Sequence, residues 1–524
     1  MKKILENNTI LTASLAAYVI ALVLQWDSYL GIAVSDVVGY ITSGVNLIKT
    51  GNFTNPFGGP EVWFPPVFPF LTGCLVNYWG MDAVSSARLI SAAASVMTLY
   101  LVFLAGRQNG TYTKTGVIAV LLLVVNPLFQ FMGTAPLSEA LATCLAVLGF
   151  FIWIGMKPQS GAGPFIKLGC VVALSYLTRP EAILLLPAWL GIDVLVGRRS
   201  LFDKRHVAAV FCCFLILLPY VYYLKVTTGK WQLSNKTQVN LAAGRAAFHG
   251  GSRERINSET LAIEFTQYPH DIKTEMRRYA WNMKQVVFAY LDIFRPPLAM
   301  VFWGLTAYGC WVLAVHRRWR FLLGTLAGLI YIFILALFSV NARYLHATLP
   351  FLALLSATGA CHLMHSFQYR RLPRMVILLC VLIGGVLFFE AYTRQIRWTL
   401  GGAEPPLILI KEAAARFRQD QLADTDCLMF EHGATFGYYS GCTRRRLTGD
   451  SLDLVIAHMR CEKGEDVYLT LYDGFESAYS PDVYDLFQKD HPHLETVFET
   501  TNDQGRVKVF KLVETNAEAL QKKN

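Results

Sequence analysis

Long apolar blocks recur throughout the first 392 residues of this chain, separated by shorter polar segments. Most blocks are about 18–22 residues long, the length of an α-helix that crosses a bilayer hydrocarbon core of about 30 Å. Backbone polar groups must be satisfied internally in such a core, so helices are the expected structure. Only 16% of the residues are charged, against roughly 25% in ordinary soluble domains. The sequence therefore predicts a mostly α-helical, polytopic membrane protein.

The apolar blocks predict about eleven transmembrane helices. They lie at residues 9–26, 84–105, 115–132, 137–155, 165–178, 181–197, 206–225, 297–315, 321–340, 345–364 and 375–392. The first block resembles a signal peptide, but no small-residue cleavage site follows it. We therefore interpret it as an uncleaved first helix.

The basic residues lie mostly in alternate loops between these blocks. These loops contain Lys2/Lys3, Arg107/Lys114, Lys157, Arg198/Arg199/Lys204/Arg205, Arg317/Arg318/Arg320 and Arg370/Arg371/Arg374. Under the positive-inside rule they are cytosolic, which places the N-terminus inside and the C-terminus outside. Membrane topology thus accounts for the net charge of +10, and no nucleic-acid partner is predicted.

Two outer segments, 27–83 and 227–295, are too long to be simple turns. In the first, Asp36 to Lys49 has the apolar spacing of an amphipathic helix lying in the membrane interface. A second apolar stretch runs from Val67 to Trp79. We assign both outer segments to a membrane domain that covers residues 1–392.

Residues 393–524 have the pattern of a small α/β domain outside the membrane. A helix is predicted at Leu407–Arg418 and strands at Asp426–Phe430, Asp466–Leu471 and Arg506–Leu512. An oxidising compartment would allow one disulfide in this domain, with the pairing left open. The candidates are Cys427, Cys442 and Cys461. No C-x-x-C pair occurs in the chain, so no metal site is predicted.

Ionisable residues gather at the outer ends of the predicted spans. They are Asp36, Arg88, Glu139, Arg179, Glu181 and Arg343, with Tyr344 and His346 beside the last. Ionisable groups are costly in a membrane and tend to face a polar cavity. Each has a simpler explanation: Asp36 as a helix cap, an arginine reaching the headgroups, Glu181 pairing locally with Arg179, or His346 as an ordinary helix residue. Their gathering on one face of the membrane favours a functional site.

A series of short motifs in this order resembles the GT-C glycosyltransferases, in particular the branch of the protein O-mannosyltransferases and the lipid A aminoarabinose transferase. The motifs are Asp36, Val38-Gly39-Tyr40, Phe64-Pro65-Pro66-Val67-Phe68-Pro69, Ala87-Arg88-Leu89, Leu137-Ser138-Glu139, Leu177-Thr178-Arg179-Pro180-Glu181 and Ala342-Arg343-Tyr344-Leu345. The resemblance covers about residues 9–392 in order and spacing. One departure is Phe64, where many relatives carry a basic residue before the Pro-Pro pair.

The resemblance implies transfer of a sugar from a polyprenyl-phosphate carrier to an acceptor hydroxyl on a glycan, a lipid or a protein. It implies that Asp36 is the general base and that Arg88 and Arg343 bind the phosphate. Glu139, Arg179 and Glu181 would contact the sugar or support these groups, and Glu61, Tyr344 and His346 are further candidates for substrate binding. Some relatives use a divalent cation, so that cofactor stays open, with no metal ligand assigned. The expected location is a bacterial inner membrane.

Two other functions remain open at this point. A lipid-linked sugar flippase would also bury charges among many spans, but internal repeats and broken helices near the midplane are typical of transporters. A polysaccharide polymerase would be an outer-face enzyme as well. The sequence specifies neither the sugar nor the acceptor.

Overall fold

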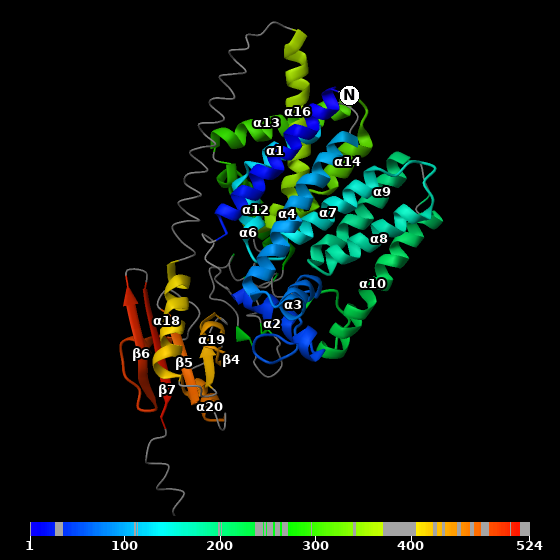
Figure 1. Cartoon of the computed structure of the whole chain (residues 1–524). Coiled ribbons are helices and arrows are strands. Elements are labelled where there is room, and N and C mark those ends of the chain that lie inside the picture. Colours follow the sequence, from blue (N-terminus) through cyan, green and yellow to red (C-terminus); the bar gives the residue numbers. More distant parts are fainter. Residues whose placement is uncertain are drawn as a thin grey trace, which may run out of the picture.

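The computed structural model has a large helical part and a small C-terminal sheet domain (Figure 1). It describes residues 2–26, 35–108, 112, 114–197, 200, 202–235, 241, 245, 248, 255–256, 263–264, 271–294, 296–338, 342–369, 405–422, 427–431, 435–447, 452–461, 466–472, 481–502 and 505–513. The predicted span at 375–392 lies outside these residues.

The helical part contains long helices, short helices, two 3₁₀ segments and two short strands. The elements are α1 (Lys2–Leu24), α2 (Ser35–Thr50), α3 (Val67–Trp79), α4 (Ala83–Gln108), α5 (Thr115–Val124), α6 (Pro127–Thr134), α7 (Glu139–Ile154), α8 (Ala162–Tyr176), η1 (Pro180–Leu184), α9 (Leu185–Gly197), α10 (Lys204–Thr228), β1 (Arg255–Ile256), β2 (Ile263–Glu264), α12 (Ile272–Phe294), α13 (Pro296–Val315), α14 (Trp319–Ala327), α15 (Ile330–Leu335), η2 (Ala342–Thr348) and α16 (Leu349–Tyr369). Strands β1 and β2 pair antiparallel.

Large aromatic side chains fill the centre of the helical part. Trp153 of α7 and Trp189 of α9 stack with their ring centroids 6.4 Å apart, and the Trp189 indole N–H donates to the carbonyl of Gly324 at 3.1 Å. Elsewhere glycine lets helices approach closely: a Cβ on Gly309 of α13 would lie 2.0 Å from the carbonyl oxygen of Leu355 in α16. Such close contacts are typical of helices that pack within a membrane.

The span predicted at 115–132 is not one straight helix. Two helices, α5 and α6, occupy this region and their axes differ by 70°. Pro127 has no N–H to continue α5, and the side chain of Asn126 caps α6 by accepting from the Phe129 N–H at 3.0 Å. The break directs α6 towards η2, against which it packs.

Helices occur at most of the other predicted positions, but the count of about eleven spans is not confirmed. Within the described residues, three helices are long and apolar enough to cross a membrane, or four if α5 and α6 count as one. The three are Ala83–Gln108, Lys204–Thr228 and Arg343–Ser366. Segments such as Glu139–Ile154 and Ala162–Tyr176 are apolar but shorter.

The two long outer segments contain helices that pack on the rest of the chain. In the first, α2 and α3 lie side by side, as the amphipathic and apolar stretches predict. In the second, residues 272–294 form a helix, α12, and not a loop. Arg278 and Asn282 of α12 are buried and donate to backbone carbonyls at residues 336–338. This part of the second segment is therefore an integral element of the fold.

The C-terminal domain has a five-stranded mixed sheet with the order β4-β3-β5-β7-β6. Its elements are α18 (Pro405–Gln421), β3 (Cys427–Glu431), α19 (Thr435–Ser440), β4 (Thr443–Arg446), α20 (Leu452–Cys461), β5 (Asp466–Tyr472), α21 (Pro481–Tyr484), η4 (Asp485–Phe487), β6 (Leu494–Asn502) and β7 (Gly505–Leu512). Strands β4, β3 and β5 are parallel, while β7 and β6 are antiparallel. The predicted helix (α18) and the three predicted strands (β3, β5 and β7) are confirmed. Strands β4 and β6 were not predicted.

The disulfide joins Cys427 and Cys442, which are 15 residues apart. It links β3 to the residue before β4, so it fixes the neighbouring parallel strands at one end. The third candidate, Cys461, ends α20.

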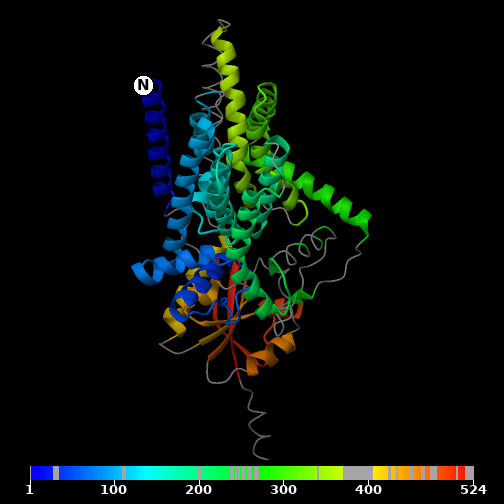
Figure 2. The same cartoon turned by 90° about the vertical axis from the view of Figure 1, so that its right-hand side faces the viewer.

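The sheet domain lies at the end of the helical part that carries α2 and α3, as both views show (Figures 1 and 2). Its short helix α19 packs on α2, and Tyr438 and Tyr439 join the apolar cluster around Val37 and Val38. The C-terminal domain therefore lies directly against α2, the helix that carries Asp36 in its first turn.

A fully buried carboxyl group holds α19 in place. Glu431, at the end of β3, accepts the backbone N–H groups of Phe436 and Gly437, both at 2.9 Å. It also accepts the hydroxyl of Tyr472 at 3.1 Å. Burial raises the pKa of Glu431 to about 7, against the opposing effect of these hydrogen bonds.

Candidate active site

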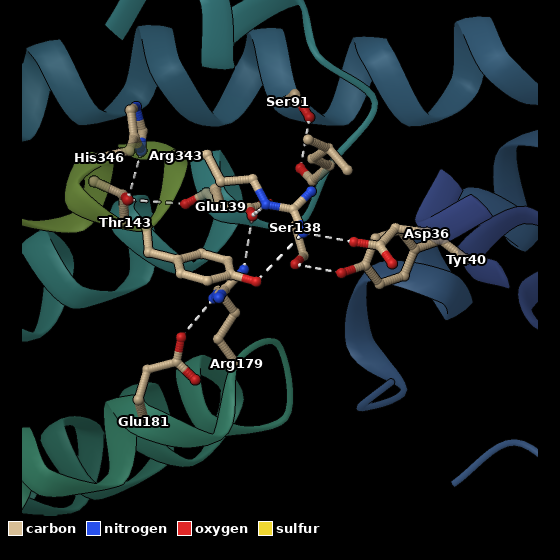
Figure 3. A network of polar contacts seen from close by, with 12 residues as sticks. Asp36, Tyr40, Ser91, Ser138, Glu139, Thr143, Arg179, Glu181, Arg343 and His346 are labelled. Carbon is tan, nitrogen blue, oxygen red and sulfur yellow. Dashed lines mark hydrogen bonds and ion pairs between the residues drawn. The ribbon is translucent and has the colours of Figure 1, made fainter. Parts of the chain in front are cut away.

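Five charged side chains from four separate segments of the helical part lie close together (Figure 3). They are Asp36, Glu139, Arg179, Glu181 and Arg343, and we call them the charge chain. All five were predicted as site residues. The segments that supply them are the first turns of α2 and α7, the start of η1, and η2.

The charges alternate in sign along this chain. Arg343 Nη2 lies 2.7 Å from Asp36 Oδ2, and Arg343 Nε lies 3.5 Å from Glu139 Oε1. The same Glu139 oxygen lies 2.9 Å from Arg179 Nη1, whose Nε in turn lies 2.6 Å from Glu181 Oε1. Glu139 at the centre is 4% exposed, whereas Asp36 and Arg343 at one end are 30% and 24% exposed. The charge chain is thus buried at Glu139, in its middle, and partly open to solvent at the Asp36 end.

Local sequence explains how two of these side chains are aimed. Pro180 disfavours a helical conformation in the residue before it, and Arg179 is accordingly extended, with φ −148° and ψ 121°. Helix η1 then starts at Pro180, so Arg179 and Glu181 face each other across a single residue. The Arg-Pro-Glu sequence by itself therefore builds the Arg179–Glu181 end of the charge chain.

Aromatic and hydroxyl side chains hold the arginines from the side. The guanidinium carbons of Arg179 and Arg343 lie 4.8 and 5.1 Å from the ring centroid of Tyr344. The Tyr344 hydroxyl also accepts from Arg343 Nη2 at 3.3 Å. Cations are attracted to aromatic faces at such distances, so Tyr344 anchors both arginines.

Tyr40 lies one helical turn after Asp36, on the same face of α2. Its hydroxyl is 3.0 Å from Ser138 Oγ, and burial raises the pKa of this phenol. Tyr40 therefore stays protonated and joins α2 to the residue that precedes Glu139.

His346 supports the site without joining the charge chain. It is buried, stacks on Phe129 of α6 and shares a hydrogen bond of 2.9 Å with Thr143. Thr143 also donates to the backbone carbonyl of Glu139 at 2.8 Å. Through these contacts His346 links η2 and α6 to the first turn of α7.

Arg88 lies apart from the charge chain. It is buried and donates to the backbone carbonyls of Thr134, Gln25 and Trp26. Its guanidinium carbon also lies 4.6 Å from the ring centroid of Trp26. These contacts tie α4 to the end of α1 and the end of α6, so the structure does not bring Arg88 together with Arg343.

Glu61 also lies outside the charge chain. Its carboxylate accepts the backbone N–H groups of Trp63 and Phe64 at 2.7 and 3.1 Å, and the side chain is 1% exposed. The contact shapes the turn that presents Phe64 and Pro65 to the neighbouring cavity.

That cavity has a volume of about 420 Å³ and adjoins the charge chain. Arg179, Glu181 and Tyr344 line one part of it, and apolar or aromatic side chains line most of the rest. The lining residues are Tyr40, Phe64, Pro65, Ser138, Tyr176, Thr178, Arg179, Pro180, Glu181, Ile183, Leu184, Leu233, Ser234, Tyr331, Ile334, Leu335, Phe338 and Tyr344.

Tyr176 and Tyr331 were not predicted as site residues, because each lies in an apolar block with no distinguishing neighbour. Thr143 was not predicted either, although its position four residues after Glu139 places it on the same helix face.

The arrangement can bind an oxyanion and accept a proton. Two guanidinium groups can each donate two parallel hydrogen bonds to a phosphate, and the partly exposed carboxylate of Asp36 can act as a base. Within the described part of the chain, no hydrogen-bond donor reaches the buried Oε2 of Glu139. The described residues contain no group of three or more His, Cys, Asp or Glu side chains able to hold a metal ion.

The chain resembles known proteins in sequence over one region and in fold over nearly its whole length. The family described as dolichyl-phosphate-mannose-protein mannosyltransferase matches residues 64–223. No curated protein matches the chain. In the apo state, ArnT from Cupriavidus metallidurans superposes with a TM-score of 0.63 at 14% identity, over 96% of this chain and 98% of ArnT. ArnT bound to undecaprenyl phosphate gives 0.62 at 14% identity, over 95% and 98%. The resemblance to the GT-C glycosyltransferases that the motifs indicate is therefore confirmed, and the chain has the fold of ArnT over nearly its whole length.

Proposed function

We propose that this protein transfers a sugar from a polyprenyl-phosphate carrier to an acceptor hydroxyl on the non-cytosolic face of a membrane. The observation that carries the proposal is the charge chain beside an aromatic-lined cavity, in which two arginines alternate with three carboxylates. The fold supports it, because ArnT has been solved with undecaprenyl phosphate bound.

In this proposal Arg343 and Arg179 bind the phosphate of the donor. Both are fixed against Tyr344, and Arg343 lies at the open end of the charge chain. As the bond to the sugar breaks, the phosphate charge grows from about −1 towards −2, and bidentate arginines stabilise that growth. A phosphate leaves readily, so the reaction requires no general acid.

Asp36 is the general base. The acceptor oxygen attacks the anomeric carbon while its proton moves to the Asp36 carboxylate, and the bonding electrons leave with the phosphate oxygen. A single attack from the side opposite the leaving group inverts the anomeric carbon. This role suits a carboxylate that is 30% exposed at the edge of the site.

The cavity would hold the sugar, because aromatic side chains such as Tyr176, Tyr331 and Tyr40 offer flat apolar surfaces to a sugar ring. Glu181 lines the cavity and Glu139 has one oxygen that accepts no hydrogen bond from the described residues, so both can accept from sugar hydroxyls.

We assign residues 1–392 to a membrane domain of about eleven spans and residues 393–524 to an outer domain, with the N-terminus in the cytosol. A bacterial inner membrane suits this arrangement. The packing of α19 on α2 supports an outer domain beside the site.

Purified protein tests the proposed reaction directly. Incubation with undecaprenyl-phosphate sugars and envelope acceptors should release undecaprenyl phosphate, detected by mass spectrometry, and envelope glycans from a strain lacking the protein should lose one sugar. Transport of the intact lipid-linked sugar without cleavage would instead support a flippase.

A further inference from the structure

Asp36 and Arg343, the proposed base and a proposed phosphate ligand, form an ion pair in this structure. Asp36 Oδ2 lies 2.7 Å from Arg343 Nη2, so the base and the phosphate ligand are bonded to each other. A carboxylate paired with a guanidinium is a weaker base, because the pair stabilises its charged form. In this arrangement neither group is ready for the role proposed for it.

We infer that the phosphate of the donor displaces Asp36 from Arg343, so that Asp36 becomes a competent base only when the donor is bound. This inference rests on the proposed function. The ligand is a phosphate monoester or diester carried on a polyprenyl lipid, and the competing group is a carboxylate of the protein itself.

Arg343 can exchange partners without leaving its position. Its guanidinium lies over Tyr344, and its Nε lies 3.5 Å from Glu139 Oε1. Asp36 is attached at Nη2, and both partners are only partly buried, at 30% and 24% exposure. The Asp36 contact is therefore the part of the charge chain that an entering anion can replace most easily.

Charge repulsion favours the separation of Asp36 from Arg343 once the donor phosphate is bound. The charge chain has three carboxylates and two guanidiniums, which leaves a formal charge of −1 when all are ionised. A donor phosphate adds about one further negative charge near groups of low solvent exposure, where like charges repel strongly. Separation of Asp36 from Arg343 relieves this repulsion, and protonation of Asp36 by the acceptor hydroxyl relieves it further.

The same exchange in reverse would release the product. After transfer, the carrier phosphate holds Arg343, and Asp36 carries the proton of the acceptor. Once Asp36 loses this proton to water, its carboxylate can compete for Arg343 again and expel the carrier. Asp36 thus serves both the chemical step and the release of the carrier.

Binding of undecaprenyl phosphate to the full-length protein in phosphatidylcholine nanodiscs tests the competition without any transfer assay. Asp36→Asn should bind the lipid about tenfold more tightly and release it more slowly, since a charge-assisted contact no longer competes. Asp36→Ala, a second variant without the carboxylate, should do the same. The gain should vanish in the double variant Asp36→Asn/Arg343→Ala.

Glu181→Gln is the matched control, because it removes the same charge from the opposite end of the charge chain. A smaller gain there than in Asp36→Asn places the competition at Arg343; an equal gain would overturn the inference, because the competition would then not be specific to Asp36. Wild-type affinity in both Asp36 variants, or in Arg343→Ala, would also overturn the inference. Phosphatidic acid and inorganic phosphate as separate ligands show whether the polyprenyl chain is required, and tighter binding of all three to Asp36→Asn supports competition for phosphate as such. Loss of transfer in Asp36→Asn is a separate result that bears on the proposed function.

Discussion

The charge chain and the C-terminal domain hold their carboxyl groups with different kinds of partner. Glu139 and Asp36 are held by arginine side chains, whereas Glu431 is held by two backbone N–H groups and a tyrosine hydroxyl. A backbone partner is fixed by the fold, so its contact cannot be handed to a ligand. A side-chain partner can move, and its charge can serve a substrate.

Arg88 lies in the helical part, but like Glu431 of the C-terminal domain it is held by backbone groups. Its hydrogen bonds go to three backbone carbonyls, while those of Arg343 go to Asp36 and Tyr344. The type of partner, more than the depth of burial, separates the groups we propose for catalysis from those that hold the fold.

We expect the largest effect, a loss of sugar transfer, when Asp36 is replaced. This is the group in the charge chain that we propose exchanges partners. Asp36→Asn should reduce transfer by about 10²–10⁴-fold, the usual loss when a general base is removed. Thermal stability should hardly change, because Asn is as good as Asp near a helix N-terminus. Release of undecaprenyl phosphate per unit protein measures the effect, and near-normal release would point to Glu139 or Glu181 as the base.

The next test replaces Arg88 and Arg343. We propose that Arg88 holds the fold and that Arg343 binds the donor phosphate. Arg88→Ala should destabilise the protein by about 2–4 kcal/mol, because buried carbonyls lose a charged donor. Arg343→Ala should instead weaken binding of undecaprenyl phosphate at least about tenfold, with little loss of stability. Arg343→Lys should recover only part of the affinity, since lysine lacks the bidentate fork. Denaturation midpoints and lipid binding are measured on the same samples; a reversed pattern would move Arg88 into the site.

The sequence could not have separated these arginines. Both follow the same rule of a basic residue at the outer end of an apolar span, and the carbonyls that bind Arg88 lie 46 to 63 residues away in the chain. The pairing of Cys427 with Cys442 was likewise open, because it depends on the place of β4 beside β3.

Other features were readable because they depend on neighbours in the sequence. The amphipathic spacing of α2 and the strand patterns of β3, β5 and β7 gave the right elements. The break between α5 and α6 was also readable: Asn126-Pro127 is a helix-start signal, but the apolar character of residues 115–132 concealed it. Tyr331 gave no signal, since its role depends on a cavity formed by several distant segments.

Glu431 tests the comparison in the C-terminal domain, because its protonation makes the stability of this domain depend on pH. Its pKa is about 7 in the folded protein and 4.5 for an ordinary glutamate, so the folded state holds the proton more tightly. The stabilisation is therefore complete below pH 4.5 and is lost as the pH rises towards 7. The loss should be about 3 kcal/mol at most.

Hydrogen exchange of the full-length protein, corrected for the intrinsic effect of pH, measures this change in residues 427–440. Protection should be greater at pH 5 than at pH 8, and Glu431→Gln, which carries no charge at either pH, should remove most of the difference. Protection that increases with pH in the wild type would mean that Glu431 is held as a carboxylate, like the acids of the charge chain.

The smallest expected effect concerns the hydroxyl of Tyr344, which accepts from Arg343 at 3.3 Å. This contact is long for a hydrogen bond, and the ring supplies the stronger interaction by lying against both guanidiniums. Tyr344→Phe keeps the ring and should weaken binding of undecaprenyl phosphate only about twofold. Tyr344→Leu removes the aromatic face and should weaken it about tenfold, since two cation–π contacts are lost. If both variants bind equally well, the aromatic anchor is unimportant and Glu139 alone holds Arg343 in place. If Tyr344→Phe loses as much as Tyr344→Leu, the hydroxyl itself contacts the phosphate, and the charge chain would gain a neutral donor among its charged members.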